Sequence, residues 1–256
     1  MDKDSDTSKN GVCVVTFSSW QDFHEKVRSI KSRRGYVWRG QRKDEDNGWF
    51  LRSSFDREVQ TNSKHDRTEK LKLHLNNFKE EMNKFYPNVL PQDDVDIWAL
   101  GQHYGLQTPP LDWSLSPYIA AYFAFIEGTA ANDLNNHYRY VYVLTRLLER
   151  LISKEKKANQ VLSSGRSVPF VDKLPYPNPR FVAQKGIFTK AFQGNHIERY
   201  VQSFSRKRPG EVVIVKLKIP TKDRETCLQE LHLMGINHTS LLLDLRDVTD
   251  RCNGKL

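Results

Sequence analysis

Apolar and polar positions alternate along the chain in a pattern that predicts short strands separated by amphipathic helices. Strands are expected where brief apolar or β-branched runs end at turn residues, at 11–17, 36–41, 138–145, 180–189, 211–219 and 239–245. Helices are expected where apolar residues recur every three or four positions, at about 18–30, 66–86, 94–104, 117–125, 147–162, 197–204 and 221–234. Because only one clean β-α-β repeat occurs, the pattern predicts an α+β fold with a mixed β-sheet core and surrounding helices.

Several helix ends carry their own sequence signals. Ser18 and Gln21 match a capping box at the start of the first helix, and Thr221 is suited to cap the last one. Pro87 stops the strongly periodic helix that begins near Asp66. We interpret that helix as scaffold and assign no chemistry to it.

A polar segment between two buried helices is the first candidate for a functional site. The helix before it begins near Asp93 and ends before Gly105, and the helix after it begins at Ser116 with a proline and an Ala-rich run. The segment 102–117 carries His, Tyr, Thr, Asp, Trp and two Ser side chains. These groups either line a cleft or have a purely structural role, in which Asp112 and the serines cap turns and their hydrogen bonds are satisfied within the protein. The residues alone favour the two alternatives equally.

Arg39 is a second anomaly, because it lies inside an otherwise apolar strand that begins Tyr36-Val37-Trp38. An isolated arginine in such a strand needs an anionic partner. That partner is either a protein carboxylate, with Asp112 the first candidate, or a phosphate or carboxylate of a ligand, which the guanidinium can hold in bidentate geometry.

The distribution of charge suggests an anionic partner. The chain has 40 Lys and Arg against 31 Asp and Glu, a net charge of +9. Fifteen basic and four acidic residues fall between Arg139 and Gly210, whose net charge of +11 exceeds that of the whole chain. This asymmetry suggests nucleic acid or a phosphorylated small molecule, although a basic surface without a partner has the same composition. Arg206, Lys207 and Arg208 are expected to form an exposed turn that contacts nucleic acid.

Cysteine usage and hydropathy bear on the compartment. Cys13, Cys227 and Cys252 are far apart and match no metal-ligand spacing, so we predict no metal site and expect a reducing cytoplasm. The N-terminus lacks the apolar core of a signal peptide, and no apolar run is long enough to span a bilayer, so no membrane partner is expected.

The domain organisation is expected to be simple. We predict a disordered N-terminus at 1–10, one domain at 11–250 and a C-terminal tail at 251–256. Four prolines indicate a loop at 163–179. The sequence leaves the oligomeric state open.

Four motifs in the right order resemble the FRG domain, a family named for its aromatic-Arg-Gly motif. The motifs are Trp38-Arg39-Gly40-Gln41, the stretch 102–106 with 111–114, the run from Ser116 to Ala124, and Arg180 with 184–188. The resemblance covers about residues 15–246. The chain departs from the family at Pro109, where an arginine is usual, and at 242–245, where a Phe-Pro-Asp-Leu-like motif is usual. The family is largely described as being of unknown function, so the resemblance does not supply a reaction.

A second resemblance, to the ADP-ribosyltransferase core, implies a chemistry. In that core an aromatic-Arg-Gly strand holds the phosphate and ribose of NAD, and a Ser-x-Ser strand leads into an Ala-x-x-Phe-Ala-like helix. A later strand carries the acidic residue that polarises the nicotinamide ribose. The resemblance gives Arg39 the first role and Ser114 and Ser116 the second, and it places Gln184 where the glutamate is expected.

The glutamine changes the expected division of roles. It can orient a ribose hydroxyl, but it cannot stabilise an oxocarbenium-like transition state, so Asp112 or Glu198 would have to supply the negative charge. The resemblance then implies His103, Asp112 and Gln184 as catalytic residues, with His103 or Asp112 contacting the ribose or transferring a proton. The residues that it implies for NAD binding are Arg39, Gly40, Gln41, Tyr104, Thr108, Trp113, Ser114, Ser116 and Phe188, of which Tyr104, Trp113 or Phe188 would stack on nicotinamide.

Three functions from different classes are therefore compatible with the sequence. The first is an NAD-dependent ADP-ribosyltransferase or NAD glycohydrolase that acts on an anionic acceptor such as nucleic acid, in a bacterial toxin or antiviral role. The second is a non-catalytic module that binds or senses nucleic acid or another phosphorylated nucleotide, with the aromatic residues as stacking platforms. The third is a nuclease or other hydrolase that uses His103 and Asp112, whose separation matches no metal-ligand spacing.

Overall fold

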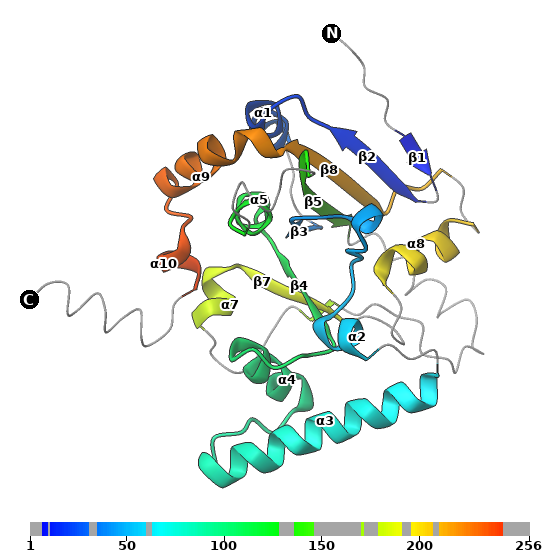
Figure 1. Ribbon diagram of the computed structural model, residues 1–256, viewed down its shortest axis with the longest axis vertical. Coiled ribbons are helices and arrows are strands. Elements are labelled where there is room, and N and C mark those ends of the chain that lie inside the picture. Colours follow the sequence, from blue (N-terminus) through cyan, green and yellow to red (C-terminus); the bar gives the residue numbers. More distant parts are fainter. Residues whose placement is uncertain are drawn as a thin grey trace, which may run out of the picture.

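A mixed β-sheet forms the centre of the computed structural model (Figure 1). The structure describes residues 7–9, 11–30, 35–59, 63–127, 136–145, 170–171, 179–190, 196–206 and 210–242. Its strands are β1 (Thr7–Lys9), β2 (Val12–Thr16), β3 (Tyr36–Gln41), β4 (Pro110–Ser114), β5 (Tyr138–Thr145), β6 (Phe170–Val171), β7 (Gly186–Lys190) and β8 (Ile214–Pro220). Its helices are α1 (Trp20–Ser29), α2 (Ser54–Glu58), α3 (Lys64–Phe85), α4 (Asp94–His103), α5 (Pro117–Phe125), α7 (Pro179–Ala183), α8 (Ile197–Ser205), α9 (Arg224–Leu233) and α10 (His238–Leu241), with 3₁₀ turns η1 (Glu45–Asn47) and η3 (Thr221–Asp223).

The strand order within the described residues is β1-β2-β8-β5-β3-β4-β7-β6. Strands β2 and β8 are parallel, whereas the other neighbouring pairs are antiparallel. The sheet is therefore mixed and the helices surround it, which confirms the predicted α+β fold.

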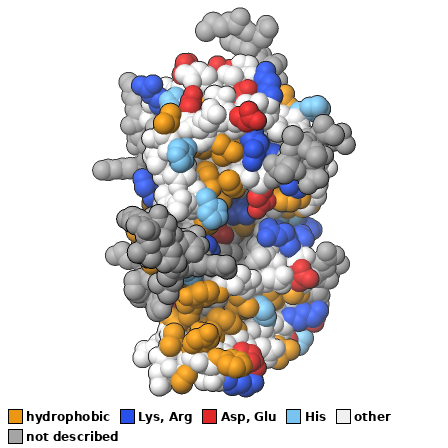
Figure 2. Space-filling model, turned by 60° about the vertical axis from the view of Figure 1, so that its left-hand side comes forward, with side chains coloured by type: hydrophobic (Ala, Val, Ile, Leu, Met, Phe, Trp, Pro, Cys, Tyr) orange, Lys and Arg blue, Asp and Glu red, His pale blue; other side chains and the backbone are white. Residues whose placement is uncertain are grey.

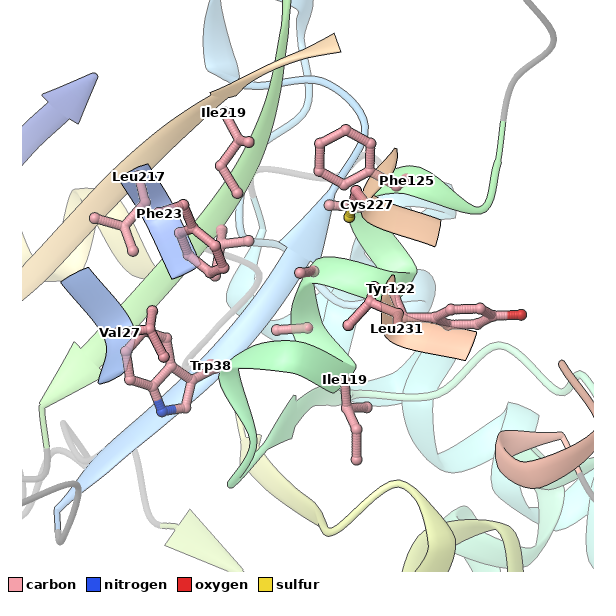
Figure 3. Close-up of a cluster of buried hydrophobic side chains, with 14 of the residues drawn as sticks. Phe23, Val27, Trp38, Ile119, Tyr122, Phe125, Leu217, Ile219, Cys227 and Leu231 are labelled. Carbon is pink, nitrogen blue, oxygen red and sulfur yellow. The ribbon is translucent and has the colours of Figure 1, made fainter. Parts of the chain in front are cut away.

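Helices α1, α5 and α9 pack against one face of the sheet. Figure 3 shows members of this cluster from the helices (Phe23 of α1, Phe125 of α5 and Leu231 of α9) and from the sheet (Trp38 and Leu217). Burial of such apolar side chains contributes roughly 1.5–3 kcal/mol each. This cluster is the main hydrophobic core, and it fixes α5 over strand β3.

Two smaller clusters complete the packing. On the opposite face, Val37 and Tyr142 of the sheet pack with Leu51 and with Ile197 of α8. The third cluster joins α3 to α4, which lie together at the bottom of Figure 1. Hydrophobic side chains also gather on the surface at that end of the molecule (Figure 2), where Phe85 at the end of α3 is largely exposed.

Helix α5 approaches strand β3 so closely that only glycine fits at position 40. A Cβ atom on Gly40 would lie 1.8 Å from the carbonyl oxygen of Ala120 and 2.6 Å from the backbone nitrogen of Ala124. The facing residues of α5 are alanines that are almost fully buried. The Arg-Gly step in β3 and the Ala-rich run of α5 are thus two halves of one packing contact.

Most of the strongly patterned elements form as predicted. Strands β3 and β5 have the predicted bounds, and α4 and α5 begin at the expected caps, Asp93 and Ser116. Gly105 has a φ of +90° after the end of α4, as a glycine at that position predicts.

Corrections at the N-terminal half concern backbone pairing and capping. Thr7–Lys9, expected to be disordered, pairs antiparallel with β2, a backbone interaction that its polar side chains do not signal. The cap of α1 is Ser19 rather than Ser18, and the Ser19 hydroxyl accepts from the backbone N–H of Asp22 at 3.1 Å. Ser18 instead donates its hydroxyl to the Asp22 carboxylate.

Corrections at the C-terminal half are larger. The strand predicted at 180–189 begins with helix α7, and its extended part starts at Gly186. The last predicted strand begins with α10, whose cap is Asn237, because the Asn237 side chain and Ser240 satisfy each other's backbone N–H groups. Thr221 lies in η3 and donates its hydroxyl to the carbonyl oxygen of Asn136 at 2.7 Å, so it does not cap α9.

Three further predictions concern a strand boundary or residues that the structure does not describe. The strand predicted at 211–219 starts later, at Ile214. The predicted helix 147–162, and the loop 163–179 apart from β6 and Pro179, lie outside the described residues.

We expect Gly40→Ala to lower the free energy of unfolding by roughly 3 kcal/mol, because the added methyl group meets backbone atoms that no side-chain rotation can move. Gly48→Ala is the matched control, since Gly48 has open space around it and a φ of +77°. It should cost about 1–2 kcal/mol, from the left-handed backbone alone. Urea denaturation measures both, and a Gly40→Ala variant as stable as the wild type would contradict the packing role.

Candidate functional site

The sheet opens between strands β3 and β4. In the described part of the chain these strands pair at one position, Trp38 opposite Ser114. Beyond it, β3 stays paired with β5 and β4 with β7, while Gly40 and Asp112 are not paired with each other. The two strands therefore leave a gap in the middle of the sheet.

A cavity of about 600 Å³ occupies this gap. Its lining comes from β3 and the turn after it (38–42), from 48–50, Arg57, Ala99, Gln102 and His103, from β4 (112–114), from Ala120, Phe123 and Glu127, and from Arg180, Phe181, Gln184, Gly186, Phe188 and Leu242. Residues from three segments in which polar groups interrupt apolar runs, 38–41, 112–114 and 184–188, thus meet around one cavity.

Arg39 extends across the gap from β3 to β4. Its Nη1 donates to the backbone carbonyl oxygen of Asp112 at 2.8 Å, and its Nε donates to Oε1 of Gln41 at 3.2 Å. The expected partner was a carboxylate or a phosphate, but both of these acceptors are neutral oxygens. Burial lowers the pKa of Arg39 from its ordinary value, opposed by the charge of Asp112, and the guanidinium still remains protonated at neutral pH. Its positive charge is therefore available to a ligand.

Asp112 presents its carboxylate to the same cavity. The side chain is accessible from the cavity, and one of its oxygens accepts a hydrogen bond from the Gln102 side chain. Partial loss of solvation among the surrounding protein atoms raises the pKa of Asp112 above its ordinary value. Arg39 and Gln102 act in the opposite direction. Asp112 is thus an acid whose protonation state responds to whatever fills the cavity.

Gln184, predicted to be catalytic, is held by structural hydrogen bonds. Its Nε2 donates to the carbonyl oxygen of Leu241 at 3.0 Å, and its own carbonyl accepts from the Ser114 hydroxyl at 2.7 Å. The Ser114 hydroxyl also accepts from the backbone N–H of Ser116 at 3.0 Å. Ser116 caps α5 and does not line the cavity. These contacts join β4, α5 and α10 around the site.

Three residues that were predicted to bind NAD have positions that the structure explains without a ligand. Thr108 is fully buried, and its hydroxyl donates to Gln102 at 2.7 Å. Tyr104 is 75% exposed and does not line the cavity, so it is not placed to stack on a ligand there. Gly40 does line the cavity, but the close approach of α5 already requires a glycine at that position.

The remaining predicted residues lie in the wall. His103 is the last residue of α4 and lines the cavity. The Trp113 indole N–H donates to Thr189 at 2.8 Å, and Phe188 stacks on Phe181 with ring centroids 5.0 Å apart. Glu198, the alternative source of negative charge, does not line the cavity, because its oxygens contact the backbone N–H of Leu51 and the ring of His196.

The loop after β3 is anchored beneath the cavity by a buried ionic cluster. Lys216 Nζ lies 3.1 Å from Asp44 Oδ2 and 2.6 Å from Glu45 Oε1, and the Tyr142 hydroxyl donates to Glu45 at 3.0 Å. Burial by itself acts to lower the pKa of Lys216, but the hydrogen bonds that its ammonium group donates to the Glu45 and Asp44 carboxylates raise that pKa above its ordinary value. This ionic cluster fixes the loop that leads to the cavity-lining residues 48–50.

Trp49 follows this loop and lines the cavity, and a hydrogen bond from the Gln41 side chain holds its backbone in place. Gln41 Nε2 donates to the carbonyl oxygens of Lys43 at 3.4 Å and Trp49 at 3.3 Å. The guanidinium of Arg42 lies 5.7 Å from the centroid of the Trp49 ring. Gln41, predicted to bind NAD, thus positions the cavity rim through backbone contacts.

Sequence reasoning missed several residues of the wall. Arg57 lies in the short helix α2 within a charged stretch, where nothing distinguishes it from a solvated side chain. Arg180 and Gln102 belong to motifs that were recognised, but neither was given a site role. Their position became clear only when α4, α7 and β4 were placed together.

Two observations on the described residues concern metal ligands and membrane-crossing helices. Among the described residues, no group of three or more His, Cys, Asp or Glu side chains could hold a metal ion. No helix in those ranges combines the length and apolar character needed to cross a bilayer. Arg206 is exposed after α8, while Lys207 and Arg208 lie outside the described residues.

Residues 34–133 match the family model of the FRG domain. The chain carries an FRG domain. The match spans less than half of the chain, and it contains Arg39, His103 and Asp112, whereas Arg180 and Gln184 lie beyond it. Comparison with curated proteins and with solved structures found no match. The FRG domain therefore supplies β3, β4, α4 and α5, and the segment after it closes the cavity.

We expect Asp112→Asn to gain stability relative to the wild type as pH rises. The folded chain holds the Asp112 proton more tightly than the unfolded chain, so this group stabilises the fold below its ordinary pKa of 3.8. That contribution is lost as pH rises from 3.8 through the raised folded value. Urea denaturation of both proteins across this window measures the difference, with Asp46→Asn as the control for loss of an exposed carboxyl. A difference between Asp112→Asn and wild type that does not change with pH would contradict the raised pKa.

Proposed function

We propose that this protein binds NAD in the cavity and transfers ADP-ribose from it to an anionic acceptor such as nucleic acid. One observation carries the proposal: Arg39 crosses the gap in the sheet, and the Asp112 carboxylate faces the same cavity. A fixed cation beside an acid with a raised pKa, in one cavity, is the arrangement expected of a reactive site.

The size and lining of the cavity support a dinucleotide. A volume of about 600 Å³ lies within the range of small-molecule sites. Trp49 and Phe50 line one part of the wall, and the stacked pair Phe181 and Phe188 lines another. Aromatic faces of this kind stack on nucleobases and on the nicotinamide ring.

The charge of the lining supports a diphosphate. Among the described lining residues, four arginines face two carboxylates. Arg39 uses its Nε and Nη1 within the protein, which leaves Nη2 for a ligand oxygen. Arg57 lines the same cavity as Arg39 and interacts electrostatically with both Arg39 and Asp112.

The proposed reaction breaks the bond between C1′ of the ribose and the nicotinamide nitrogen. The bonding electrons leave with nicotinamide, a nucleophilic atom of the acceptor bonds to C1′, and the acceptor gives up its proton. Positive charge develops on the ribose, and the ionised carboxylate of Asp112 stabilises it. Arg39 orients the diphosphate, and His103 in the same wall is the candidate to take the proton. With water as the acceptor, the same site is an NAD glycohydrolase.

We expect Asp112→Asn to lower kcat for nicotinamide release about 100-fold or more, with the Kd for NAD nearly unchanged, because the lost charge acts mainly in the transition state. In the wild type, the rate should rise with pH through the raised pKa of Asp112, since the carboxylate form is required. Arg39→Lys should instead raise the Kd, because lysine cannot reach Gln41, Asp112 and a phosphate together. Glu225→Gln, on the exposed side of α9, should match the wild type.

Chromatographic detection of nicotinamide and calorimetric titration with NAD measure these effects. A folded wild-type protein that does not bind NAD would overturn the proposal. Binding without turnover, whatever acceptor is offered, would favour a nucleotide-sensing module. That second candidate is supported by Gln184, which stands at the expected glutamate position and whose amide is already bonded to Leu241.

For the acceptor, we expect binding to nucleic acid to weaken steeply as salt increases, because each neutralised phosphate releases counterions. Arg206→Glu should reduce this affinity without loss of fold, since Arg206 is exposed. Fluorescence anisotropy at several salt concentrations measures both. Binding that does not depend on salt, or that Arg206→Glu leaves unchanged, would remove this surface from the acceptor site.

A further inference from the structure

The guanidinium group of Arg180, at the start of α7, has one N–H group that is hydrogen-bonded and another that has no acceptor among the described residues. Its Nη1 donates to the carbonyl oxygen of His103 at 3.2 Å. Its Nε is buried and has no hydrogen-bond partner among the described residues. No carboxylate in the described part of the chain forms an ion pair with it at hydrogen-bonding distance.

A buried guanidinium N–H without an acceptor is unfavourable, so such a group in a cavity wall indicates a ligand oxygen. Nε and Nη2 together form the edge of arginine that grips two oxygens of one phosphate. Arg39 cannot use this edge, because its Nε is bonded to Gln41. Arg180 is thus better suited than Arg39 to bidentate binding.

Arg180 also occupies a different part of the cavity from Arg57. Arg180 is bonded to the His103 carbonyl oxygen at the end of α4, whereas Arg39 is bonded to the Asp112 carbonyl oxygen in β4, and Arg57 interacts electrostatically with Arg39 and Asp112. Phe181 and Phe188, whose rings stack on each other, also line the cavity. An anion at Arg180 would therefore be separate from a diphosphate held at Arg39 and Arg57.

We propose that Arg180 forms a second anion subsite, which binds a phosphomonoester of the ligand. This inference rests on the proposed function and narrows its substrate class. NADP carries a phosphomonoester on the 2′ oxygen of its adenosine ribose, and NAD does not. A phosphomonoester carries close to two negative charges at neutral pH and suits the free edge of Arg180. The cavity therefore selects NADP over NAD.

Calorimetric titrations with NAD and NADP at one ionic strength test this selection. The wild type should bind NADP about 10- to 100-fold more tightly than NAD, the range expected for a charged hydrogen-bonded contact. Arg180→Gln should remove the preference by weakening NADP alone. Arg180→Lys should keep part of it, because lysine retains the charge and loses the fork. Val182→Gln, at an exposed position of the same helix, should retain it fully.

Adenosine 2′-phosphate separates this inference from the proposed function, because it lacks both diphosphate and nicotinamide. It should bind the wild type and lose binding in Arg180→Gln. Equal affinities of the wild type for NAD and NADP would overturn the second subsite and leave the proposed function standing. An equal loss of both dinucleotides in Arg180→Gln would place Arg180 at the shared diphosphate and would also overturn it. If adenosine 2′-phosphate binds through Arg180 but neither dinucleotide does, the subsite stands as a phosphomonoester site and the proposed function fails.

Discussion

The contact between helix α5 and strand β3 at Gly40 is the constraint on which the site depends. Because a Cβ atom there would meet the backbone of Ala120, the helix lies directly on the strand. Strand β4 leads into this helix through a turn of two residues, so its C-terminal end at Ser114 stays beside β3 and the start of the helix. Toward the N-terminal end of β4 the two strands are not paired, and the cavity fills the space between Gly40 and Asp112. Packing of a few small residues thus determines where Arg39 and Asp112 meet.

Several arginines around the cavity donate hydrogen bonds to backbone carbonyl oxygens. Arg39, Arg57 and Arg180 each donate to a carbonyl in this way. Arg139 and Arg224 also donate hydrogen bonds to backbone carbonyl oxygens, in their case near the end of α5. A carbonyl orients a guanidinium without cancelling its charge. The interior around the cavity therefore remains positive, which a cavity that receives a phosphorylated ligand requires.

The sequence predicted those features that depend on local pattern. Strands β3 and β5 and the caps of α4 and α5 follow from residues close together in the chain. The misassigned elements depend on distant contacts. Helix α7 was read as a strand because Phe181 and Val182 suit either structure, and only the packing of Phe181 on Gly186 and Phe188 distinguishes them. Gln184 matched a catalytic position by order in the chain, but its bond to Leu241 depends on a helix 57 positions away.

The single paired position between β3 and β4 also affects how this fold can change. The main chain contributes little to the connection between the two parts of the sheet at that point, and side chains such as Arg39 and Gln102 complete it. The width of the opening is thus set by residues that point mutations can exchange one at a time. Strand register, whose alteration would reverse every side chain along a strand, does not have to move. A chain built in this way can acquire a new ligand while the rest of its sheet keeps the same hydrogen-bond ladder.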